Sequence, residues 1–406
     1  MYFKGALHGA LPPMPRVIWI VHILSVIGTR PEAIKLAPLI LEFEQKRDIT
    51  HSLCLTGQHR DLVQPVLQQF GLKSTYDLNL MAPEQSLAAL TAAILDGLSN
   101  ILDAEQPDWL VVQGDTSSAF AAALAGFYAA IPVLHVESGL RSHDPLNPWP
   151  EEAHRRMISP IATLHAAPTA AAALSLEREG IARENILISG NSGIDALHKM
   201  CVRLDQDADL LARTQAQLPL SRPDKRLIFV TCHRREQRAE RLQGLARALI
   251  HLAARGDVDI ILPTHPSPQV HSPLHSALDG KAGIALVPPL DYAATVCLLR
   301  TCHFVISDSG GLQEEAPSLG KPILVLRDVT ERQEAVDAGA AILVGQSEER
   351  ILTQANRLLD HPTYYAGMAR LRKLFGDGKA SARIVEHLMT HHKNTHVAQR
   401  TRHHQS

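Results

Sequence analysis

The chain has 406 residues, of which 45% are hydrophobic and 20% charged, proportions that are typical of a soluble globular protein. Its 40 Lys and Arg residues are balanced by 42 Asp and Glu residues, so the net charge of -2 excludes a general attraction to nucleic acid or membrane. The five cysteines include no CxxC pair, which predicts reduced core residues in a cytoplasmic protein, and no histidine spacing predicts a metal site.

At this length we expect two domains. Residues 1–15 contain proline and lack periodicity, so we interpret them as an N-terminal extension, and residues 17–27 are too short an apolar run to span a bilayer. After them, apolar runs alternate with helical stretches, the pattern of a parallel sheet with crossover helices. The alternation predicts a Rossmann-like domain over residues 16–190, with strands at residues 23–27, 52–56, 109–113, 133–136, 164–167 and 186–189.

Charged side chains follow these strands, at the sheet edge where doubly wound domains bind ligands. Arg30 follows the first strand, and Lys35 lies one turn into the next helix. Two cations at the positive end of a helix favour a bound phosphate, although solvated surface charges are the alternative. Asp115 and Glu137 follow two buried strands, and Asp115 could instead cap the helix after it.

A loop with three prolines leads from His143 into Glu151, Glu152 and Arg155, where another helix begins. Acidic residues are common in the first turn of a helix. Several carboxylates in one cleft would, however, raise one another's pKa, which is how a general acid and a general base arise from one residue type. The acidic residues of this domain therefore predict a site that transfers protons.

A polar passage at about residues 205–225 predicts an irregular segment before a second alternation of strands and helices. We expect a second Rossmann-like domain over residues 191–372, so the fold class is α/β with two doubly wound domains facing a cleft. Residues 373–392 should form a helix that packs back on the first domain, and residues 393–406 a polar, disordered tail. The second set of strands is expected at residues 227–231, 260–263, 285–287, 304–307, 323–326 and 341–344.

Residues 304–332 read as a strand, a glycine turn, a short acidic helix, a proline turn and another strand. Ser309, Gly310 and Gly311 form the glycine turn, where the free N–H groups and the dipole of the helix can bind a diphosphate. Glu315, about one turn further in, can accept hydrogen bonds from ribose hydroxyls. The segment predicts a nucleoside diphosphate site, although acidic helix starts also occur for stability alone.

Basic residues follow other strands of the second domain. His233 and Arg234 follow the strand at residues 227–231, while His265 and Arg332 follow later strands. If these residues face the acids across a cleft, the site is bipolar. The basic side would hold phosphates and the acidic side would transfer protons.

These motifs resemble those of the non-hydrolysing UDP-N-acetylglucosamine 2-epimerases of bacteria. The similarity extends from about residue 23 to residue 386 and depends on many separate motifs in the same order. They are GTRPEAIKLAPL, QGDTSS, HVESGLRS, PWPEE, CHRRE, SDSGGLQEEAPSLGKP, RDVTER and FGDG.

The resemblance implies a GT-B-like fold and reversible inversion at C2, which converts UDP-N-acetylglucosamine into UDP-N-acetylmannosamine for cell-envelope or capsular polysaccharides. It also implies a homodimer whose second domain, residues 191–372, binds UDP. The cysteines and the balanced charge predict a cytoplasmic protein with no nucleic acid or membrane partner. Catalytic roles are implied for Asp115, Glu137, Glu151 and His233. Substrate contacts are implied for Arg30, Lys35, His233, Ser309, Gly310, Gly311, Glu315 and Arg332.

In this family a second UDP-GlcNAc can act as an allosteric activator, near the positions that match Gln58, Arg234 and His265. The chain departs from the family pattern close to these positions. Ser138 and Cys232 replace smaller or apolar residues, PTHPSP replaces a PVHxNP pattern, and residues 290–295 lack a Gln and a Phe found near the uracil. These departures bear on whether the activator is needed.

The C2 hydrogen of a 2-acetamido sugar is not next to a carbonyl carbon, so its removal and return need another route. No GxGxxG motif follows a strand, which argues against a nicotinamide, and we expect no cofactor. We therefore expect elimination of UDP to a 2-acetamidoglucal and its readdition. The alternatives are an epimerase for a modified UDP-2-acetamido sugar, a GT-B glycosyltransferase, which needs no C2 base, or a nucleotide-sugar sensor.

Overall fold

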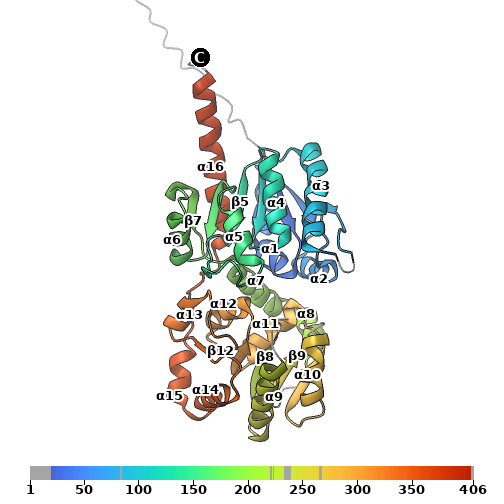
Figure 1. The fold of residues 1–406 in the computed structure, drawn as a ribbon, viewed down its shortest axis with the longest axis vertical. Helices are drawn as coiled ribbons and strands as arrows, with labels where there is room; N and C mark the ends of the chain where they lie inside the picture. Colours follow the sequence, from blue (N-terminus) through green and yellow to red (C-terminus); the bar gives the residue numbers. More distant parts are fainter. Residues whose placement is uncertain are drawn as a thin grey trace, which may run out of the picture.

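The computed structural model describes residues 20–82, 85–219, 222, 224–232, 239–264 and 268–403. Two parallel sheets form two α/β domains, drawn one above the other in Figure 1. The first sheet has the order β3-β2-β1-β4-β5-β6-β7, and the second has the order β10-β9-β8-β11-β12-β13. The strands are β1 (Val21–Ile27), β2 (Ile49–Leu55), β3 (Tyr76–Asp77), β4 (Trp109–Gln113), β5 (Val133–Val136), β6 (Leu164–Ala167), β7 (Ile186–Ile188), β8 (Arg226–Thr231), β9 (Val258–Pro263), β10 (Ile284–Val287), β11 (Phe304–Ser307), β12 (Ile323–Val325) and β13 (Ala341–Leu343).

Helices cover both faces of each sheet, which is why strands such as β4 and β11 are buried along their whole length and apolar except for their last residue. The expected α/β fold with two doubly wound domains is therefore confirmed. The helices are α1 (Arg30–Glu44), α2 (Arg60–Phe70), α3 (Leu87–Glu105), α4 (Ser117–Tyr128), α5 (Glu151–Ile158), α6 (Ala170–Arg178), the 3-10 turn η1 (Arg183–Asn185), α7 (Ser192–Gln206), α8 (Ala208–Ala216), α9 (Ala239–Ala254), α10 (Pro268–Leu278), α11 (Tyr292–Thr301), α12 (Gly310–Ser318), α13 (Gln333–Asp337), α14 (Glu348–Asp360), α15 (Pro362–Met368) and α16 (Ala380–His403).

Both sheets reverse their strand order beside the first strand of the domain, between β1 and β4 and between β8 and β11. In doubly wound sheets the ligand binds at the carboxyl ends of the strands at this reversal. The turns after β1, β4 and β11 are therefore the first places to look for a site. They carry Arg30, Asp115 and Ser309.

The chain passes between the domains twice at one place. Asn191, just before α7, donates its backbone N–H to the carbonyl of Phe375 at 2.6 Å. A Cβ added at Gly190, where φ is +85°, would lie 3.1 Å from Cα of Gly376, so the close approach of the two crossing segments requires glycine. The two crossings form one narrow connection.

After the second crossing, α16 lies against α1 of the first domain and against α7, which follows the first crossing (Figure 1). Its side chains Ile384 and Leu388 belong to the same core cluster as strands and helices of that domain. Indole Nε1 of Trp109 on β4 also donates to Nδ1 of His392 at 3.3 Å. The domain boundary near residue 190 stays a prediction.

Three local expectations differ from the structure. The two-residue strand β3 was not expected, because so short a pair has no apolar run. The passage at residues 205–225 is not wholly irregular, since α8 lies within it, capped by Asp207, whose side chain accepts the N–H of Leu210 at 2.8 Å. Helix α16 continues to His403, past the expected end at His392.

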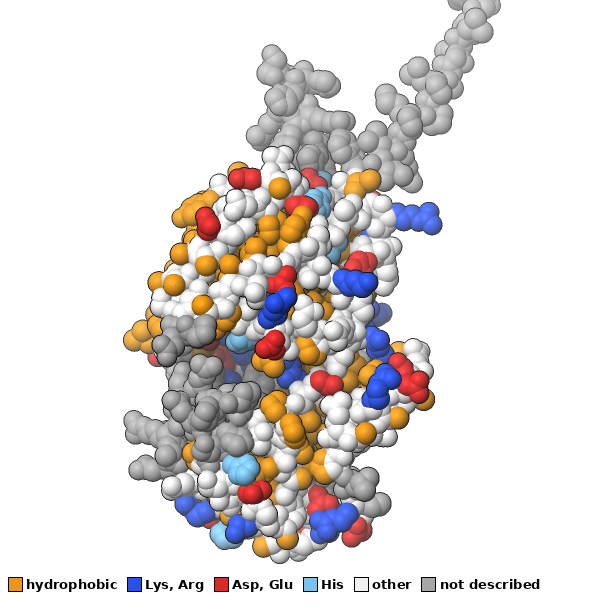
Figure 2. Space-filling view, turned by 90° about the vertical axis from the view of Figure 1, so that its right-hand side faces the viewer, with side chains coloured by type: hydrophobic (Ala, Val, Ile, Leu, Met, Phe, Trp, Pro, Cys, Tyr) orange, Lys and Arg blue, Asp and Glu red, His pale blue; other side chains and the backbone are white. Residues whose placement is uncertain are grey.

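Helix α3 is long and apolar enough to cross a membrane, by length and composition only. One face of α3, including Leu90, Ile94 and Leu98, packs against the first sheet and α4 in the core of that domain. Hydrophobic side chains gather on the upper lobe in Figure 2, on the side where α3 lies. An amphipathic covering helix of a globular domain has the same composition, so the membrane indication is weak.

Candidate active site

The turn between β1 and α1 is fixed by a buried carboxylate. Glu32 accepts the backbone N–H groups of Gly28 and Thr29, each at 2.6 Å, and the hydroxyl of Thr116. Burial raises the pKa of Glu32 to about 7 in spite of these hydrogen bonds. A Cβ at Gly28 would lie 2.0 Å from Oγ of Ser118, so only glycine allows the turn to approach α4. The turns after β1 and β4 are thereby held together.

Arg30 and Lys35 of α1 reach toward the second domain. Burial lowers the pKa of Arg30, against the effect of Asp291, Glu315 and Tyr292, which lie near it. The ammonium group of Lys35 donates to Glu137. Burial alone would lower the pKa of Lys35, but the nearby carboxylates outweigh it and raise that pKa.

Glu137 follows β5 in the left-handed backbone region, with φ of +62°, a conformation that costs a non-glycine residue about 1 kcal/mol or more. Its carboxylate accepts from Lys35, from the side-chain amide of Gln113, and from Nδ2 of Asn191 at 3.0 Å. Burial tends to raise the pKa of Glu137, but Lys35 and Arg332 outweigh burial and leave that pKa below its ordinary value. The neighbouring Asp115 does raise this pKa, as expected, but its effect is smaller than that of the two cations, so the net shift is downward.

Asp115 follows β4 but does not cap the next helix. Thr116 is the cap, and its hydroxyl accepts the N–H of Ala119 at 3.1 Å. The Asp115 carboxylate accepts from Nε of Arg155 at 2.7 Å and keeps 25% of its side-chain surface exposed. Asp115 lies close enough to Glu137 to affect its pKa. The two acids thus share one edge of the first sheet.

The two acids that begin α5 are not equivalent. Glu152 is fully buried, where it accepts the N–H of Ser142 at 3.0 Å and a hydrogen bond from Arg155 at 3.3 Å. It therefore fixes the loop before α5. Glu151 is the first residue of the helix and is partly exposed.

The start of α12 has free hydrogen-bond donors, as predicted from its glycines. The N–H of Ser309 donates to Oγ of Ser307 at 2.9 Å, but no acceptor in the described part of the chain meets the N–H groups of Gly310 and Gly311. Cζ of Arg332 would lie 3.0 Å from a Cβ at Gly310, so this guanidinium covers the helix start. A cation at the positive end of a helix favours an anion between them.

Arg332 connects the domains through acids on both sides. Its Nε donates to Glu314 at 2.9 Å, and its other nitrogens lie 3.4 Å from Glu331 and 3.8 Å from Glu137. Burial tends to lower the pKa of Arg332, but these carboxylates raise it. Basic and acidic groups are therefore interleaved among the described residues. The bipolar arrangement expected from the sequence is not found there.

Glu315 lies five residues into α12, where the hydroxyl of Tyr292 donates to its Oε1 at 3.1 Å. Burial raises the pKa of Glu315 to about 7. Gln58 also lies near the turns of the first domain, and its carbonyl oxygen accepts from Ser118 at 2.7 Å. His233, Arg234 and His265 lie outside the described residues.

The structure therefore gathers Arg30, Lys35, Glu137, Glu315 and Arg332 where the domains meet, with Asp115 at the adjoining edge. Reasoning from the sequence did not single out four residues that complete this cluster. Glu314 was passed over beside Glu315, and Asn191 follows a strand just as Glu137 does, which was the available signal. The missed residues are Gln113, Arg155, Asn191 and Glu314.

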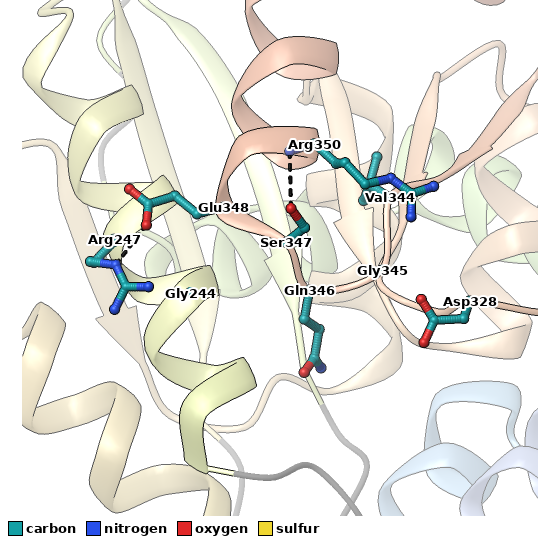
Figure 3. A pocket seen from close by; sticks show the side chains of 9 residues that line it. All are labelled: Gly244, Arg247, Asp328, Val344, Gly345, Gln346, Ser347, Glu348 and Arg350. Carbon is teal, nitrogen blue, oxygen red and sulfur yellow. Dashed lines mark hydrogen bonds and ion pairs between the residues drawn. The ribbon is translucent and has the colours of Figure 1, made fainter.

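A separate pocket of about 380 Å³ opens between α9 and the start of α14 (Figure 3). Arg247 and Glu348, which form an ion pair of 2.6 Å, line it together with Gly345 and Gln346. None of the predicted site residues lines it. This pocket is distinct from the charged cluster between the domains.

Comparison with known proteins defines the class of this fold. The structure is similar to the crystal structure of the Neisseria meningitidis UDP-GlcNAc 2-epimerase bound to UDP-GlcNAc, with a TM-score of 0.88 and 41% sequence identity. The match covers 91% of this chain and 100% of that one. The two domains therefore form a GT-B-like enzyme fold.

The sequence profile of the UDP-N-acetylglucosamine 2-epimerase family matches residues 41–389. The UDP-N-acetylglucosamine 2-epimerase of Escherichia coli K12 is 42% identical over 367 residues, which are 90% of this chain and 98% of that protein. A probable UDP-N-acetylglucosamine 2-epimerase of Ralstonia solanacearum is 43% identical over 364 residues, 89% and 97% of the two chains. The chain belongs to this family and is an epimerase, an enzyme of the isomerase class.

Proposed function

We propose that the protein interconverts UDP-N-acetylglucosamine and UDP-N-acetylmannosamine by eliminating and readding UDP. The observation that carries the proposal is the 3.8 Å separation of Glu137 and Arg332. Glu137 is an acid of the first domain whose side chain is only 7% exposed, and Arg332 covers the free N–H groups that start α12. The carboxylate that would take the sugar proton thus lies beside the helix start that would bind the departing diphosphate.

UDP would bind along α12. The N–H groups of Gly310 and Gly311, with Ser309 and Arg332, would hold the diphosphate. Glu315 would accept hydrogen bonds from the ribose, since its carboxylate lies near the same helix start. Arg30 and Lys35 would bring positive charge from the first domain. His233, which comes two residues after β8 in the sequence, would also contact the substrate.

In the first step, a carboxylate removes the C2 proton while the bond between C1 and the UDP oxygen breaks. The electron pair of the C2–H bond forms the C1=C2 double bond of a 2-acetamidoglucal, and UDP leaves with the pair of the C1–O bond. The helix start and the arginines stabilise the charge that develops on the diphosphate. UDP then adds back to C1, while a carboxylic acid delivers a proton to the other face of C2.

Asp115, Glu137 and Glu151 would share the acid and base roles, together with His233. Carboxyl groups in one cleft can act as acid and as base because their different surroundings move their pKa values apart. The donors around Glu137 keep it ionised, whereas Asp115 is held by one arginine and is partly exposed. The reaction consumes neither water nor a redox cofactor, because product and substrate are isomers.

The test is incubation with UDP-GlcNAc alone in deuterated water, followed by proton NMR of the anomeric and C2 signals. We expect UDP-ManNAc to appear with deuterium at C2. Free UDP with no epimer, or no change, would overturn the proposal. Asp115→Asn, Glu137→Gln and Glu151→Gln should each slow exchange, and unchanged turnover in all three would remove their assignment.

The same assay distinguishes the other candidates. A GT-B glycosyltransferase needs an acceptor and would leave C2 unexchanged, and a sensor would bind without product. An enzyme for a modified UDP-2-acetamido sugar would turn over that sugar faster than UDP-GlcNAc. The product would supply cell-envelope or capsular polysaccharide synthesis in the cytoplasm.

Two further properties belong to the same proposal. The protein would form a homodimer, since α3 and the exposed Phe127 and Tyr128 of the neighbouring α4 leave apolar surface uncovered on the first domain. Light scattering tests this, and a monomer at micromolar concentration would contradict it.

A second UDP-GlcNAc would act as an activator beside Gln58, Arg234 and His265. A plot of initial rate against UDP-GlcNAc concentration would then be sigmoidal.

A further inference from the structure

One side-chain amide joins the two domains at the place where the chain crosses between them. Nδ2 of Asn191 donates to Oε1 of Glu137 at 3.0 Å and to Oε2 of Glu314 at 2.7 Å. Glu137 ends a strand of the first domain, and Glu314 lies on α12 of the second. Both hydrogens of one NH₂ group are therefore used by carboxylates of opposite domains.

The orientation of this amide is fixed from the other side. Oδ1 of Asn191 accepts the N–H of Gly193 at 2.8 Å and so caps α7. The backbone N–H of Asn191 donates to Phe375 of the returning crossing segment. The side chain is only 1% exposed. Because Oδ1 is held by the helix cap, the NH₂ group must point at the two carboxylates.

The charges around the Asn191 amide distinguish its effect from that of an ion pair. Lys35 from α1 and Arg332 from before α13 face the same two carboxylates, Glu137 and Glu314. Ion pairs tolerate a range of angles, whereas the amide sets the separation of the two acids through two short, directed hydrogen bonds. If α12 moves away from the crossing point, the amide loses its Glu314 acceptor and the link between the two carboxylates is broken.

We propose that Asn191 is a positioning residue, which places the Glu137 carboxylate for reaction and ties it through the same amide to Glu314 on α12. The inference rests on the proposed epimerase activity and deepens it. Binding of the diphosphate at the start of α12 is thereby coupled to the placement of the acid that acts on the sugar. Asn191 itself transfers no proton.

The first test separates bridging from capping. Ser is a good helix cap but is too short to reach both carboxylates, so Asn191→Ser should keep the melting temperature within a few degrees. We expect kcat to fall about 10- to 100-fold, the effect of losing a hydrogen bond to a charged group, with KM within about twofold. A folded Asn191→Ser variant with wild-type kcat would overturn the inference.

The second test uses a signature that a merely structural role would not produce. Asn191→Asp removes both donors and adds a third carboxylate beside Glu137 and Glu314, so the cluster should take up a proton more readily. Its kcat should recover relative to wild type as the pH falls from 8 to 6, because a protonated Asp can donate again. The exposed Asn100→Asp on α3 is the matched control and should follow the wild-type profile.

Glu314→Gln combined with Asn191→Asp transposes the acid and the amide across the same hydrogen bond. We expect the double variant to be more active than Asn191→Asp at pH 8. A loss in Asn191→Asp that is equal at every pH, and unchanged by Glu314→Gln, would overturn the inference. If wild type itself gives no epimer, the proposed function falls and this inference with it; if wild type is active and Asn191→Ser matches it, only this inference falls.

Discussion

The guanidinium of Arg332 lies 3.8 Å from Oε1 of Glu137, although the two residues belong to different domains. The same guanidinium donates to Glu314 and covers Gly310 at the start of α12. One cation therefore contacts both the proposed diphosphate site and a proposed catalytic acid. The proposed reaction therefore needs groups from both domains at once.

Glu137→Gln should lower kcat about 10²- to 10⁴-fold, because the amide can neither exchange a proton nor carry the charge that Lys35 and Arg332 stabilise. The measurement is UDP-ManNAc formation and deuterium incorporation at C2 by NMR. Glu349→Gln, at an exposed position on α14, is the control and should have wild-type rates. A Glu137→Gln variant that keeps more than about a tenth of wild-type kcat would speak against the assignment.

Gly310→Ala should weaken UDP binding by about tenfold, the equivalent of one hydrogen bond. The new methyl group would lie 3.0 Å from Cζ of Arg332 and would push the guanidinium away from the helix start. Isothermal titration with UDP measures the effect. Gly367→Ala on α15 meets no atom within 4 Å and should leave the affinity unchanged. Equal affinity in both variants would place the diphosphate elsewhere.

Glu315 should make stability depend on pH. Burial raises its pKa from an ordinary 4.5 to about 7, so the folded state binds its proton more tightly than the unfolded state. The stability from this proton is fully present below pH 4.5 and is lost as the pH rises through about 7, amounting to about 3 kcal/mol.

Glu315→Gln keeps an acceptor for the hydroxyl of Tyr292 but cannot ionise. Its melting temperature should match wild type near pH 4.5 and exceed wild type at pH 8. Glu32, whose pKa is also raised to about 7, is present in both proteins, so its contribution cancels in the difference. A difference that does not change with pH would show that Glu315 titrates normally.

Leu388→Ala on α16 should lower the free energy of unfolding of the first domain by about 2 to 5 kcal/mol, because it leaves a cavity in that core. Urea unfolding followed by tryptophan fluorescence measures it, since Trp109 donates to His392 on the same helix. Thr390→Ala, on the exposed face, should change the value by less than about 0.5 kcal/mol. Similar effects in both would mean that α16 does not complete the core.

The strands could be predicted well because their apolar runs are continuous. Strands β4, β5, β6 and β11 have the predicted bounds, since buried parallel strands contrast sharply with the helices around them. Helix α8 was missed because its sequence is polar and lies near prolines. Its helical state depends on the Asp207 cap and on packing against α11, neither of which a local pattern reveals.

For the site, the rule that ligand groups follow strand ends located Asp115 and Glu137. It could not decide that Glu152 rather than Glu151 would be fully buried, because both begin the same helix. The expected separation of acids from bases does not hold for Arg332, which lies among carboxylates of both domains. For His233, Arg234 and His265 it stays a prediction. Which charges pair depends on how the domains meet, and that relationship is not local in sequence.

The return of the last helix to the first domain also sets an order of events during synthesis. The core that surrounds Leu39 and Val111 includes Leu388, which leaves the ribosome some 280 residues after β4 has emerged. The second domain, encoded in between, has its whole sequence available sooner. We therefore expect the domain that is begun last to mature first, while the earlier one waits with an open flank that a chaperone could recognise.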